Sequence, residues 1–272
     1  MRRLSMAKRA EGAKVALVPT MGALHEGHLS LVRIAVTKAD FVIVSIFVNP
    51  IQFGPSEDYS KYPRELEEDA RKLDSLGAHV IFTPDNTIMY PPEHSTYVSV
   101  EGLTEELCGR SRPVHFKGVA TVVTKLFNIV MPHLAVFGQK DAQQLAVIRR
   151  LVTDLNMDVE IVQAPIVREP DGLAMSSRNS YLSKKEREQA SVIYKALCAG
   201  EKLAESGVVV SSDIINEAHK ILGKAPLAKT EYIEIADIDD MSPVDDISGG
   251  AILAVAVWIG KTRLIDNVLL NK

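Results

Sequence analysis

The sequence has few cysteines and no long apolar run. Only Cys108 and Cys198 are present among 272 residues, too few for a disulfide framework. The longest strongly apolar runs, 41–48 and 251–259, fall well short of the ~18 residues that a membrane-spanning helix needs. The opening residues, M-R-R-L-S-M-A-K-R-A-E-G, lack the apolar core of a signal peptide. We therefore expect a cytoplasmic protein with no membrane partner.

Neither sign of charge dominates the chain. Lys and Arg number 31 against 35 Asp and Glu, a net charge of −4, and no block of like charges stands out. This balance disfavours nucleic acid and anionic membranes as partners. Hydrophobic residues make up 46% and charged residues 24%, close to the average of globular proteins, which excludes disordered and fibrous architectures. The length allows one large domain or two unequal ones.

Short β-branched runs alternate with helical patterns from residue 15 to residue 163. The strand patterns cover 15–18, 41–48, 79–84, 134–138 and 159–163, with helical patterns between them and an irregular stretch at 84–118. Such alternation is typical of a parallel sheet, and near-continuous apolar strands are expected where helices cover both faces. We predict a Rossmann-like, doubly wound α/β domain over residues 1–166.

The alternation stops after Pro165. Ser183 and Glu186 have the spacing of a capping box, which predicts a helix to about residue 207, and a second helix is predicted over about 212–223. Three strand patterns follow, at 230–237, 251–259 and 262–270, separated by turn-rich segments that suit an antiparallel sheet. We predict that residues 167–272 form a smaller α+β lid domain of helices and a three-stranded antiparallel sheet.

The segment P-T-M-G-A-L-H-E-G-H, residues 19–28, joins the first predicted strand to the first helix. Open parallel sheets bind ligands at this edge, and a helix N-terminus offers free N–H groups and a positive dipole end to phosphates. His25 and His28 would share one helix face, and Gly22 and Gly27 permit close backbone approach. Two imidazoles could donate hydrogen bonds and, if protonated, add positive charge where a pentacovalent phosphorus transition state is negative.

Two alternatives exist for this histidine pair. Each ring could merely cap the helix or pack against it. A zinc site is the other alternative, but the spacing is not H-E-x-x-H and no Cys or His cluster supplies further ligands. We favour the phosphate site, because the pair is tied to a strand-to-helix junction that contains glycines.

Two further motifs could bind phosphates. G-Q-K-D, residues 138–141, follows a predicted strand at the same edge, where Lys140 could reach phosphates while Asp141 orients it or caps the next helix. A surface Lys beside an Asp is common, so this signal is weak alone. M-S-S-R-N, residues 175–179, lies where a mobile loop between domains is expected, and Arg178 could bind phosphate oxygens in bidentate fashion. The alternative for this loop is a solvated turn.

A fourth motif, F-V-N-P-I-Q-F-G at residues 47–54, ends the second predicted strand. Asn49 and Gln52 are neutral polar groups among apolar ones, the mix expected where a small organic substrate is oriented. Further along, Asp69 is a candidate Mg²⁺ contact. The alternative is that the acidic side chains around Asp69 only stabilise the start of their helix by interacting with its dipole.

The H-x-G-H helix start and the downstream Ser-Ser-Arg loop resemble the nucleotidyltransferase superfamily. The strings V-P-T-M-G-A-L-H-E-G-H, S-I-F-V-N-P-I-Q-F, S-R-P-V-H-F-K-G-V, F-G-Q-K-D, D-G-L-A-M-S-S-R-N and R-L-I-D-N, spread over about residues 15–267, are similar to the pantoate–β-alanine ligase family. The resemblance implies Mg²⁺- and ATP-dependent condensation of (R)-pantoate with β-alanine through a pantoyl adenylate, releasing pyrophosphate and then AMP. It also implies a homodimer. One departure concerns the start, since family members usually carry a further segment of about one helix before the first strand, whereas residues 1–14 precede it here.

The resemblance assigns roles to individual residues. His28 would be the proton donor with His25 as its companion, and Lys140 and Arg178 would complete the catalytic set. Gln52 would bind pantoate and lie near β-alanine, and Gln144 would bind pantoate; Asn49 is the further substrate-binding candidate, from the fourth motif. The implied ATP contacts are Pro19, Thr20, Met21, Gly22, Ala23, Leu24, His25, Glu26, Gly27, His28, Gly138, Gln139, Lys140, Asp141, Val167, Met175, Ser176, Ser177 and Arg178.

Other functions stay open at this point. A nucleotidyltransferase that keeps the nucleotide on its product would need no amine and would release no AMP. A nucleotide-binding regulatory module without catalysis is a second alternative, which the intact set of two histidines, Lys140 and Arg178 disfavours. We expect no tRNA-charging role, because no anticodon-binding extension follows the Ser-Ser-Arg loop and the net charge is −4.

Overall fold

The computed structural model describes residues 1–55 and 57–270, and within them five strands form one parallel sheet. The order is β3-β2-β1-β4-β5. The strands are β1 (Val15–Thr20), β2 (Phe41–Ile46), β3 (Val80–Phe82), β4 (Leu134–Gly138) and β5 (Glu160–Ala164). The chain starts at the centre, runs outward to β3, and then returns to continue on the other side of β1. The sheet therefore has a switch point between β1 and β4, where ligands bind in folds of this kind.

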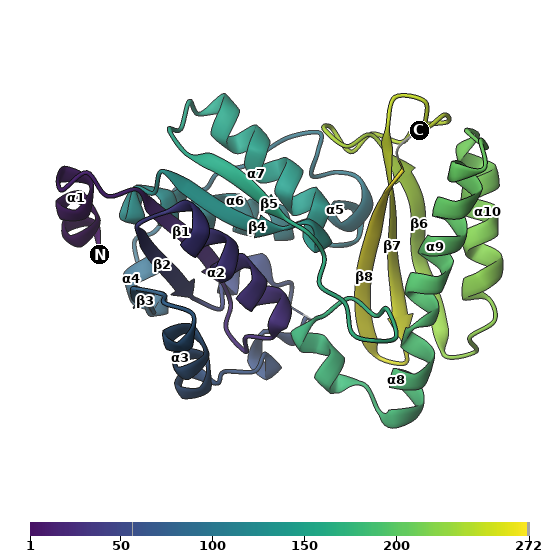
Figure 1. Cartoon of the computed structure of the whole chain (residues 1–272), viewed down its shortest axis with the longest axis horizontal. Helices are drawn as coiled ribbons and strands as arrows, with labels where there is room; N and C mark the ends of the chain where they lie inside the picture. Colours follow the sequence, from purple (N-terminus) through teal and green to yellow (C-terminus); the bar gives the residue numbers. More distant parts are fainter. Residues whose placement is uncertain (56, 271–272) are drawn as a thin grey trace.

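Helices cover both faces of this sheet (Figure 1). One face packs on α2 (Glu26–Lys38) and α3 (Leu66–Ser75), and the other on α6 (His115–Val130) and α7 (Ala142–Asp154). Successive residues of β1 alternate between the two cores: Ala16 and Val18 belong to the first, Val15 and Leu17 to the second. The prediction of a doubly wound parallel sheet is confirmed.

The stretch 84–118, predicted as irregular, contains two short helices. These are α4 (Asn86–Met89), which the Asp85 side chain caps through a 2.8 Å hydrogen bond from Ile88 N, and α5 (Leu107–Ser111). Helices this short show no periodic apolar pattern, which explains why the sequence did not reveal them. The helix α1 (Arg2–Ala10) precedes β1, and its Arg9 donates to the carbonyl of Met131 over 2.7 Å.

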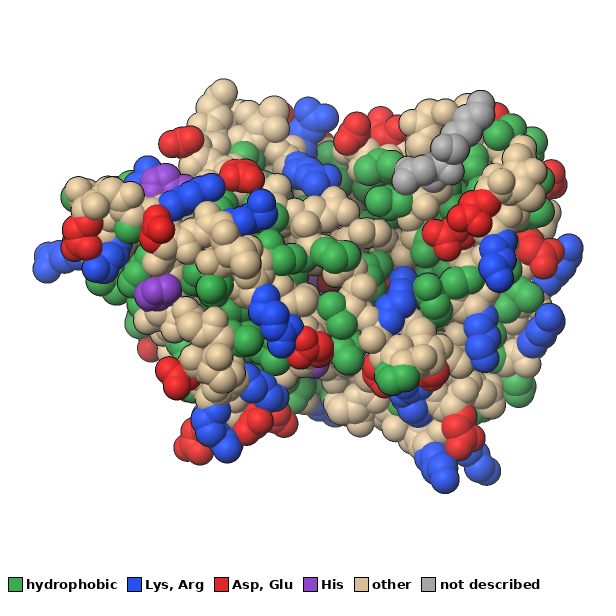
Figure 2. All heavy atoms as spheres, viewed as in Figure 1, with side chains coloured by type: hydrophobic (Ala, Val, Ile, Leu, Met, Phe, Trp, Pro, Cys, Tyr) green, Lys and Arg blue, Asp and Glu red, His purple; other side chains and the backbone are tan. Residues whose placement is uncertain are grey.

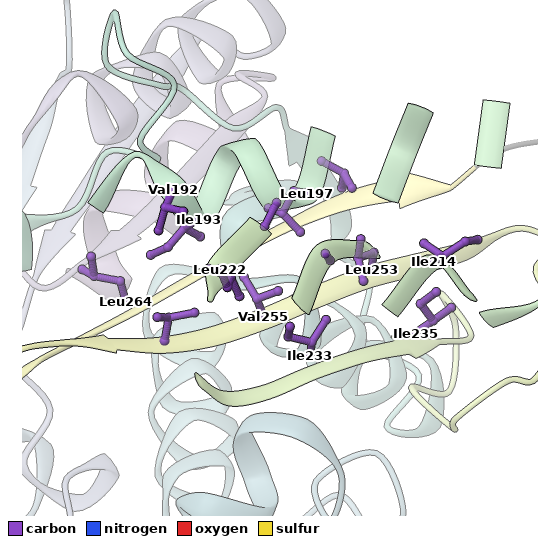
Figure 3. Packing of buried hydrophobic residues seen from close by; sticks show 14 of the residues in the cluster. Val192, Ile193, Leu197, Ile214, Leu222, Ile233, Ile235, Leu253, Val255 and Leu264 are labelled. Atoms are coloured by element: carbon purple, nitrogen blue, oxygen red, sulfur yellow. The ribbon is translucent and has the colours of Figure 1, made fainter. Parts of the chain in front are cut away.

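The C-terminal part holds a second, antiparallel sheet of β6 (Ala228–Ala236), β7 (Ala251–Ile259) and β8 (Thr262–Leu270), in that order. The helices α8 (Lys184–Ala190), α9 (Val192–Glu205) and α10 (Ser211–Leu222) precede it in the chain. Figure 3 shows side chains of α9 and α10 meeting those of the three strands in one apolar core. The α+β prediction is therefore confirmed.

The single helix predicted over 183–207 is wrong in one respect, because it breaks at Ser191 into α8 and α9. The capping box at its start is present: Ser183 Oγ accepts from Glu186 N over 3.4 Å, and Glu186 Oε2 accepts from Ser183 N over 2.8 Å. Ser191 is buried and serves as both the last cap of α8 and the first of α9.

The two sheets meet through a small apolar cluster. It joins α5, α6 and α7 to β6 and β7 through side chains that include Cys108, Phe116, Val147 and Ile252. The domain boundary at residue 166 stays a prediction. On the face drawn in Figure 2, basic and acidic side chains are interspersed. Over the described residues, no helix combines the length and the apolar character needed to cross a membrane.

A close approach of α6 to the short 3-10 helix η1 (Pro50–Gln52) depends on Gly118. A Cβ atom at Gly118 would lie 2.5 Å from Gln52 Cα and 2.6 Å from Gln52 N, closer than real Cβ contacts. The carbonyl of Gly118 also accepts a 3.1 Å hydrogen bond from Asn49 Nδ2. Glycine at this position therefore lets the Asn49–Gln52 turn rest directly on the helix.

We predict that Gly118→Ala lowers the free energy of unfolding by about 1–3 kcal/mol, because the added methyl group must push the η1 backbone away from α6. Chemical denaturation measures the change. Gly249→Ala is the matched control, since a Cβ there meets nothing within 4 Å. Equal stabilities of the two variants would contradict the packing argument.

Candidate active site

A cavity of about 970 Å³ lies at the carboxyl ends of the central parallel strands. It brings together most of the residues that the sequence singled out, from five separate segments. Those lining it are Pro19, Thr20, Met21, His25, Gly27, His28, Asn49, Gln52, Gly138, Lys140, Asp141, Gln144, Val167, Met175, Ser176, Ser177 and Arg178. Absent from its lining are Gly22, Ala23, Leu24, Glu26 and Gln139, all predicted ATP contacts.

The two histidine rings form a capping box at the start of α2. His25 Nδ1 accepts from Gly27 N over 3.2 Å, and His28 Nδ1 accepts from His25 N over 3.4 Å. The ring centroids lie 4.0 Å apart. Because Nδ1 accepts in each ring, the neutral imidazole carries its proton on Nε2. Capping and phosphate binding are thus compatible, because in each ring Nδ1 caps the helix and the Nε2–H group stays available to a phosphate.

Both histidines are neutral at physiological pH. Burial, together with a smaller effect of the neighbouring Lys140, lowers the pKa of His25 to about 4. Burial, with smaller effects from His25 and Lys140, lowers the pKa of His28 to about 3. The positive charge considered for these rings is therefore not available, and each ring can offer an anion only a neutral Nε2–H donor.

Asp69 holds the loop that leads into α2. Its Oδ2 accepts from Ala23 N over 2.9 Å and its Oδ1 from Leu24 N over 2.7 Å, and the carboxylate is fully buried. The loop needs such support, because Gly22 and Ala23 both have positive φ, +82° and +50°. Asp69 as a Mg²⁺ contact stays a prediction, although both of its carboxylate oxygens already accept backbone N–H groups and it does not line the cavity. Within residues 1–55 and 57–270, no three His, Cys, Asp or Glu side chains gather as a metal site.

We predict that Asp69→Asn lowers the free energy of unfolding by about 1–3 kcal/mol, because one of the two backbone N–H groups then faces an amide N–H. The Mg²⁺ concentration needed for half-maximal activity should not change. Asp74→Asn, on the exposed face of the same helix, is the control. A large rise in that Mg²⁺ concentration would support the metal assignment.

Lys140 lies in the short 3-10 helix η3 (Gln139–Asp141), which follows β4 directly. Its Nζ is 3.9 Å from Asp141 Oδ2, and its side chain is 22% exposed. Asp141 precedes α7 but makes no side-chain capping bond, so of the two roles considered for it only the contact with Lys140 is present. Gln139 turns away from the cavity and accepts from Gln163 Nε2 over 3.2 Å. Lys140 is thus the residue of this motif that brings positive charge to the cavity.

Arg178 is held by an aspartate that the sequence did not reveal. Its Nε and Nη2 donate to the two carboxylate oxygens of Asp58, each over 2.9 Å. Ser177 Oγ donates to the carbonyl of Ala23 over 3.2 Å, and Ser176 Oγ accepts from Arg178 N. The loop is therefore anchored and not a solvated turn. Since one edge of the guanidinium pairs with Asp58, Nη1 is left to bind an anion.

The polar groups of the fourth motif form a small network beside Met21. Asn49 is 1% exposed; its Nδ2 donates to Gln52 Oε1 over 3.0 Å, and its Oδ1 accepts from Tyr90 Oη over 2.7 Å. Gln52 Nε2 lies 3.2 Å from Met21 Sδ. Apolar side chains of the same cavity surround this network: Phe47, Val119, Val122, Val123, Leu126 and Phe137. This end of the cavity suits a small molecule with both polar and methyl groups.

Two residues of the string S-R-P-V-H-F-K-G-V support Gln52, although the sequence assigned them no role. His115 Nδ1 lies 3.1 Å from the Gln52 carbonyl, and Arg112 Nη2 donates to the same oxygen over 3.4 Å while also pairing with Glu57. Burial, with the charge of Arg112, lowers the pKa of His115 to about 4. Their place in the string S-R-P-V-H-F-K-G-V was the sequence signal from which a role for Arg112 and His115 could have been predicted.

Together, the switch point of the sheet, the capped helix start and the loops that carry Lys140 and Arg178 define an α/β protein with a cavity suited to phosphates. A family model for pantoate-beta-alanine ligase matches residues 1–269. A pantothenate synthetase of Thermotoga petrophila is 54% identical over 271 residues, covering 100% of this chain and 97% of that protein. The chain belongs to the pantoate–β-alanine ligase family, a family of enzymes.

Solved structures agree with this assignment. Pantothenate synthetase from Thermus thermophilus superposes with a TM-score of 0.94 at 45% identity, covering 98% of each chain. Pantoate–β-alanine ligase from Francisella tularensis, in complex with β,γ-ATP and β-alanine, gives a TM-score of 0.80 at 36% identity, covering 98% of this chain and 94% of that one. The fold is that of the family over nearly the whole chain.

We predict that the free energy of unfolding falls as the pH drops from about 6.5 to about 4. The pKa values of His25, His28 and His115 lie near 4, 3 and 4 in the folded chain, against 6.5 for an exposed histidine. The unfolded chain therefore binds more protons across this interval, and stability is fully present only above it. Urea denaturation at several pH values measures the slope.

His115→Gln should reduce this pH dependence, whereas His219→Gln, on the exposed side of α10, should leave it unchanged. Stability that rises on acidification through this interval would contradict the assignment of neutral rings.

Proposed function

We propose that this chain condenses (R)-pantoate with β-alanine to form pantothenate, using ATP and releasing pyrophosphate and AMP. The observation that supports this most is the single cavity, which joins the capped histidine pair, Lys140 and Arg178 to a polar pocket at Asn49 and Gln52. The cationic side suits a triphosphate, and the pocket beside it suits a small hydroxy acid. Family membership supplies the particular substrates.

In the first step, a carboxylate oxygen of pantoate attacks the α-phosphorus of ATP, and the bond to pyrophosphate breaks. Two anions must be brought together in line, so the protein acts through position and charge. Lys140 and Arg178 supply fixed positive charge to the phosphates. The Nε2–H groups of His25 and His28 donate hydrogen bonds as negative charge grows on the phosphoryl oxygens. The family's proton-donor role for His28 is then hydrogen-bond donation by a neutral ring.

In the second step, the uncharged amine of β-alanine attacks the acyl carbon of pantoyl adenylate. The C–N bond forms, the bond from the acyl carbon to the phosphate oxygen breaks, and AMP leaves while the nitrogen gives up a proton to the phosphate of the departing AMP. The leaving group is already good, so orientation and exclusion of water carry this step. Gln52 and Gln144, both at the cavity wall, orient pantoate, and the loop of residues 175–178 covers the phosphates.

Mg²⁺ enters as part of the Mg²⁺–ATP substrate. Asp69 is committed to two backbone N–H groups, and within the described residues no three His, Cys, Asp or Glu side chains gather as a metal site. Mg²⁺ is commonly held largely by substrate phosphates and water. We further propose, from the family, a cytoplasmic homodimer, in which residues 167–272 act as a lid on the domain of residues 1–166.

The test measures AMP and pyrophosphate released from Mg²⁺–ATP with (R)-pantoate, with and without β-alanine, while product mass is followed. We expect steady AMP formation only with both substrates, and pantothenate as the product. His28→Ala should lose most adenylation while its circular-dichroism spectrum stays like that of the unchanged protein.

Two results would overturn the proposal. A product that keeps the nucleotide would indicate a nucleotidyltransferase. Tight ATP binding with no pantoate-dependent turnover would indicate a regulatory module.

A further inference from the structure

The string R-L-I-D-N ends in two buried polar residues of β8 to which the proposed function gives no role. Asp266 and Asn267 are 3% and 2% exposed. Asn267 Nδ2 donates to the carbonyl oxygens of both Gln139 and Lys140, each over 3.0 Å, and its Oδ1 accepts from Gln139 Nε2 over 3.3 Å. The whole amide of Asn267 is thus directed at η3, the segment that carries Lys140.

The neighbouring Asp266 supports the segment that leads into the loop of residues 175–178, which carries Arg178. Its carboxylate pairs with Arg168 over 2.6 and 3.1 Å, and its Oδ1 also accepts from Asn267 N over 2.8 Å. Arg168 stacks 3.9 Å above the ring of Tyr194 and forms an isolated antiparallel bridge with Ala174. Ala174 directly precedes the loop of residues 175–178. Two adjacent residues of one strand therefore hold the bases of both phosphate-binding segments.

The geometry of η3 explains why it needs this support. It is a single turn of three residues between β4 and α7, and Asp141 gives the start of α7 no side-chain cap. Short 3-10 turns have poor internal hydrogen bonds, so outside donors decide the orientation of their peptide planes. Without the Asn267 amide, the Gln139 and Lys140 carbonyls would lose a donor that comes from the second sheet.

We propose that Asn267 is a positioning residue that fixes the Lys140 backbone, and thereby aims its ammonium group at the phosphates of the nucleotide. This inference rests on the proposed function through the role of Lys140. Asn267 also lines the cavity, but its amide is engaged with η3, so it acts through two carbonyl groups. Misplacement of a reacting or binding group by about 1 Å can cost on the order of 10²-fold in rate.

The test is a double-mutant cycle on adenylation. We expect Asn267→Ala to slow single-turnover adenylation about 10- to 100-fold, with KM for pantoate nearly unchanged. In the background of Lys140→Ala, Asn267→Ala should slow adenylation by less than about a further 3-fold, because the effects of two interacting residues on a rate are not additive. Amine transfer from preformed pantoyl adenylate should slow less than adenylation in Asn267→Ala, because pyrophosphate has already left and AMP is a good leaving group that depends less on the charge of Lys140.

Two further variants separate positioning from stability. Val268→Ala removes a core side chain from the next position of β8, so it should lower the melting temperature without slowing adenylation. Asn267→Asp keeps the shape but turns a carboxylate toward two carbonyl oxygens, and should be at least as slow as Asn267→Ala. Fully additive effects in the cycle, or an equal loss of rate in Val268→Ala, would overturn the proposal.

A failure of the proposed function would look different. In that case the unchanged protein would show no pantoate-dependent AMP, while the Kd of Mg²⁺–ATP could still be measured. Asn267→Ala should then weaken ATP binding in the presence of Lys140 and not in its absence. The same weakening in both backgrounds would overturn the positioning role independently of the reaction.

Discussion

The site depends above all on the parallel pairing of β1 with β4 at the centre of the sheet. Ala16 pairs with Leu134 and Leu17 with Ala135, so both strands end at the same edge. The loop after β1 carries the two histidines, and the turn after β4 carries Lys140. Because no other strand separates them, groups more than a hundred residues apart in sequence share one cavity. The same pairing places Lys140 near enough to depress the pKa of both rings.

This arrangement divides the electrostatic work between two kinds of group. The histidines are buried, so they stay neutral and serve as oriented hydrogen-bond donors. Positive charge comes from Lys140 and Arg178, and each has a nearby carboxylate: Asp141 at 3.9 Å and Asp58 in a bidentate pair. A free guanidinium would lose rotamer freedom on binding an anion. Holding it in place beforehand removes that cost at the moment of binding.

The sequence predicted those features that local patterns encode. Apolar strands such as β2 and β7 and the junction of β1 with α2 were all visible in short windows. The break at Ser191 was not, because a buried serine is compatible with a continuous helix. The supporting residues were hidden for another reason. Asp69 bonds to residues 45 and 46 positions away, Asp58 to Arg178 across 120, and Asn267 to Gln139 across 128. No periodicity or spacing records such contacts.

The hydrogen bonds of Asp266 and Asn267 in β8 connect the second sheet to the segments that carry Lys140 and Arg178. Burial raises the pKa of Asp266, and the pairing with Arg168 opposes that rise, so the charge of the carboxylate depends on this arginine. A buried ion pair is a poor source of stability compared with apolar packing, but it fixes a unique arrangement because each partner is costly to leave alone. An apolar contact here could slide; the Arg168–Asp266 pair and the Asn267 amide cannot move without breaking hydrogen bonds. The relative position of η3, which carries Lys140, and of the loop that carries Arg178 therefore follows from the register of β8, a strand outside both segments.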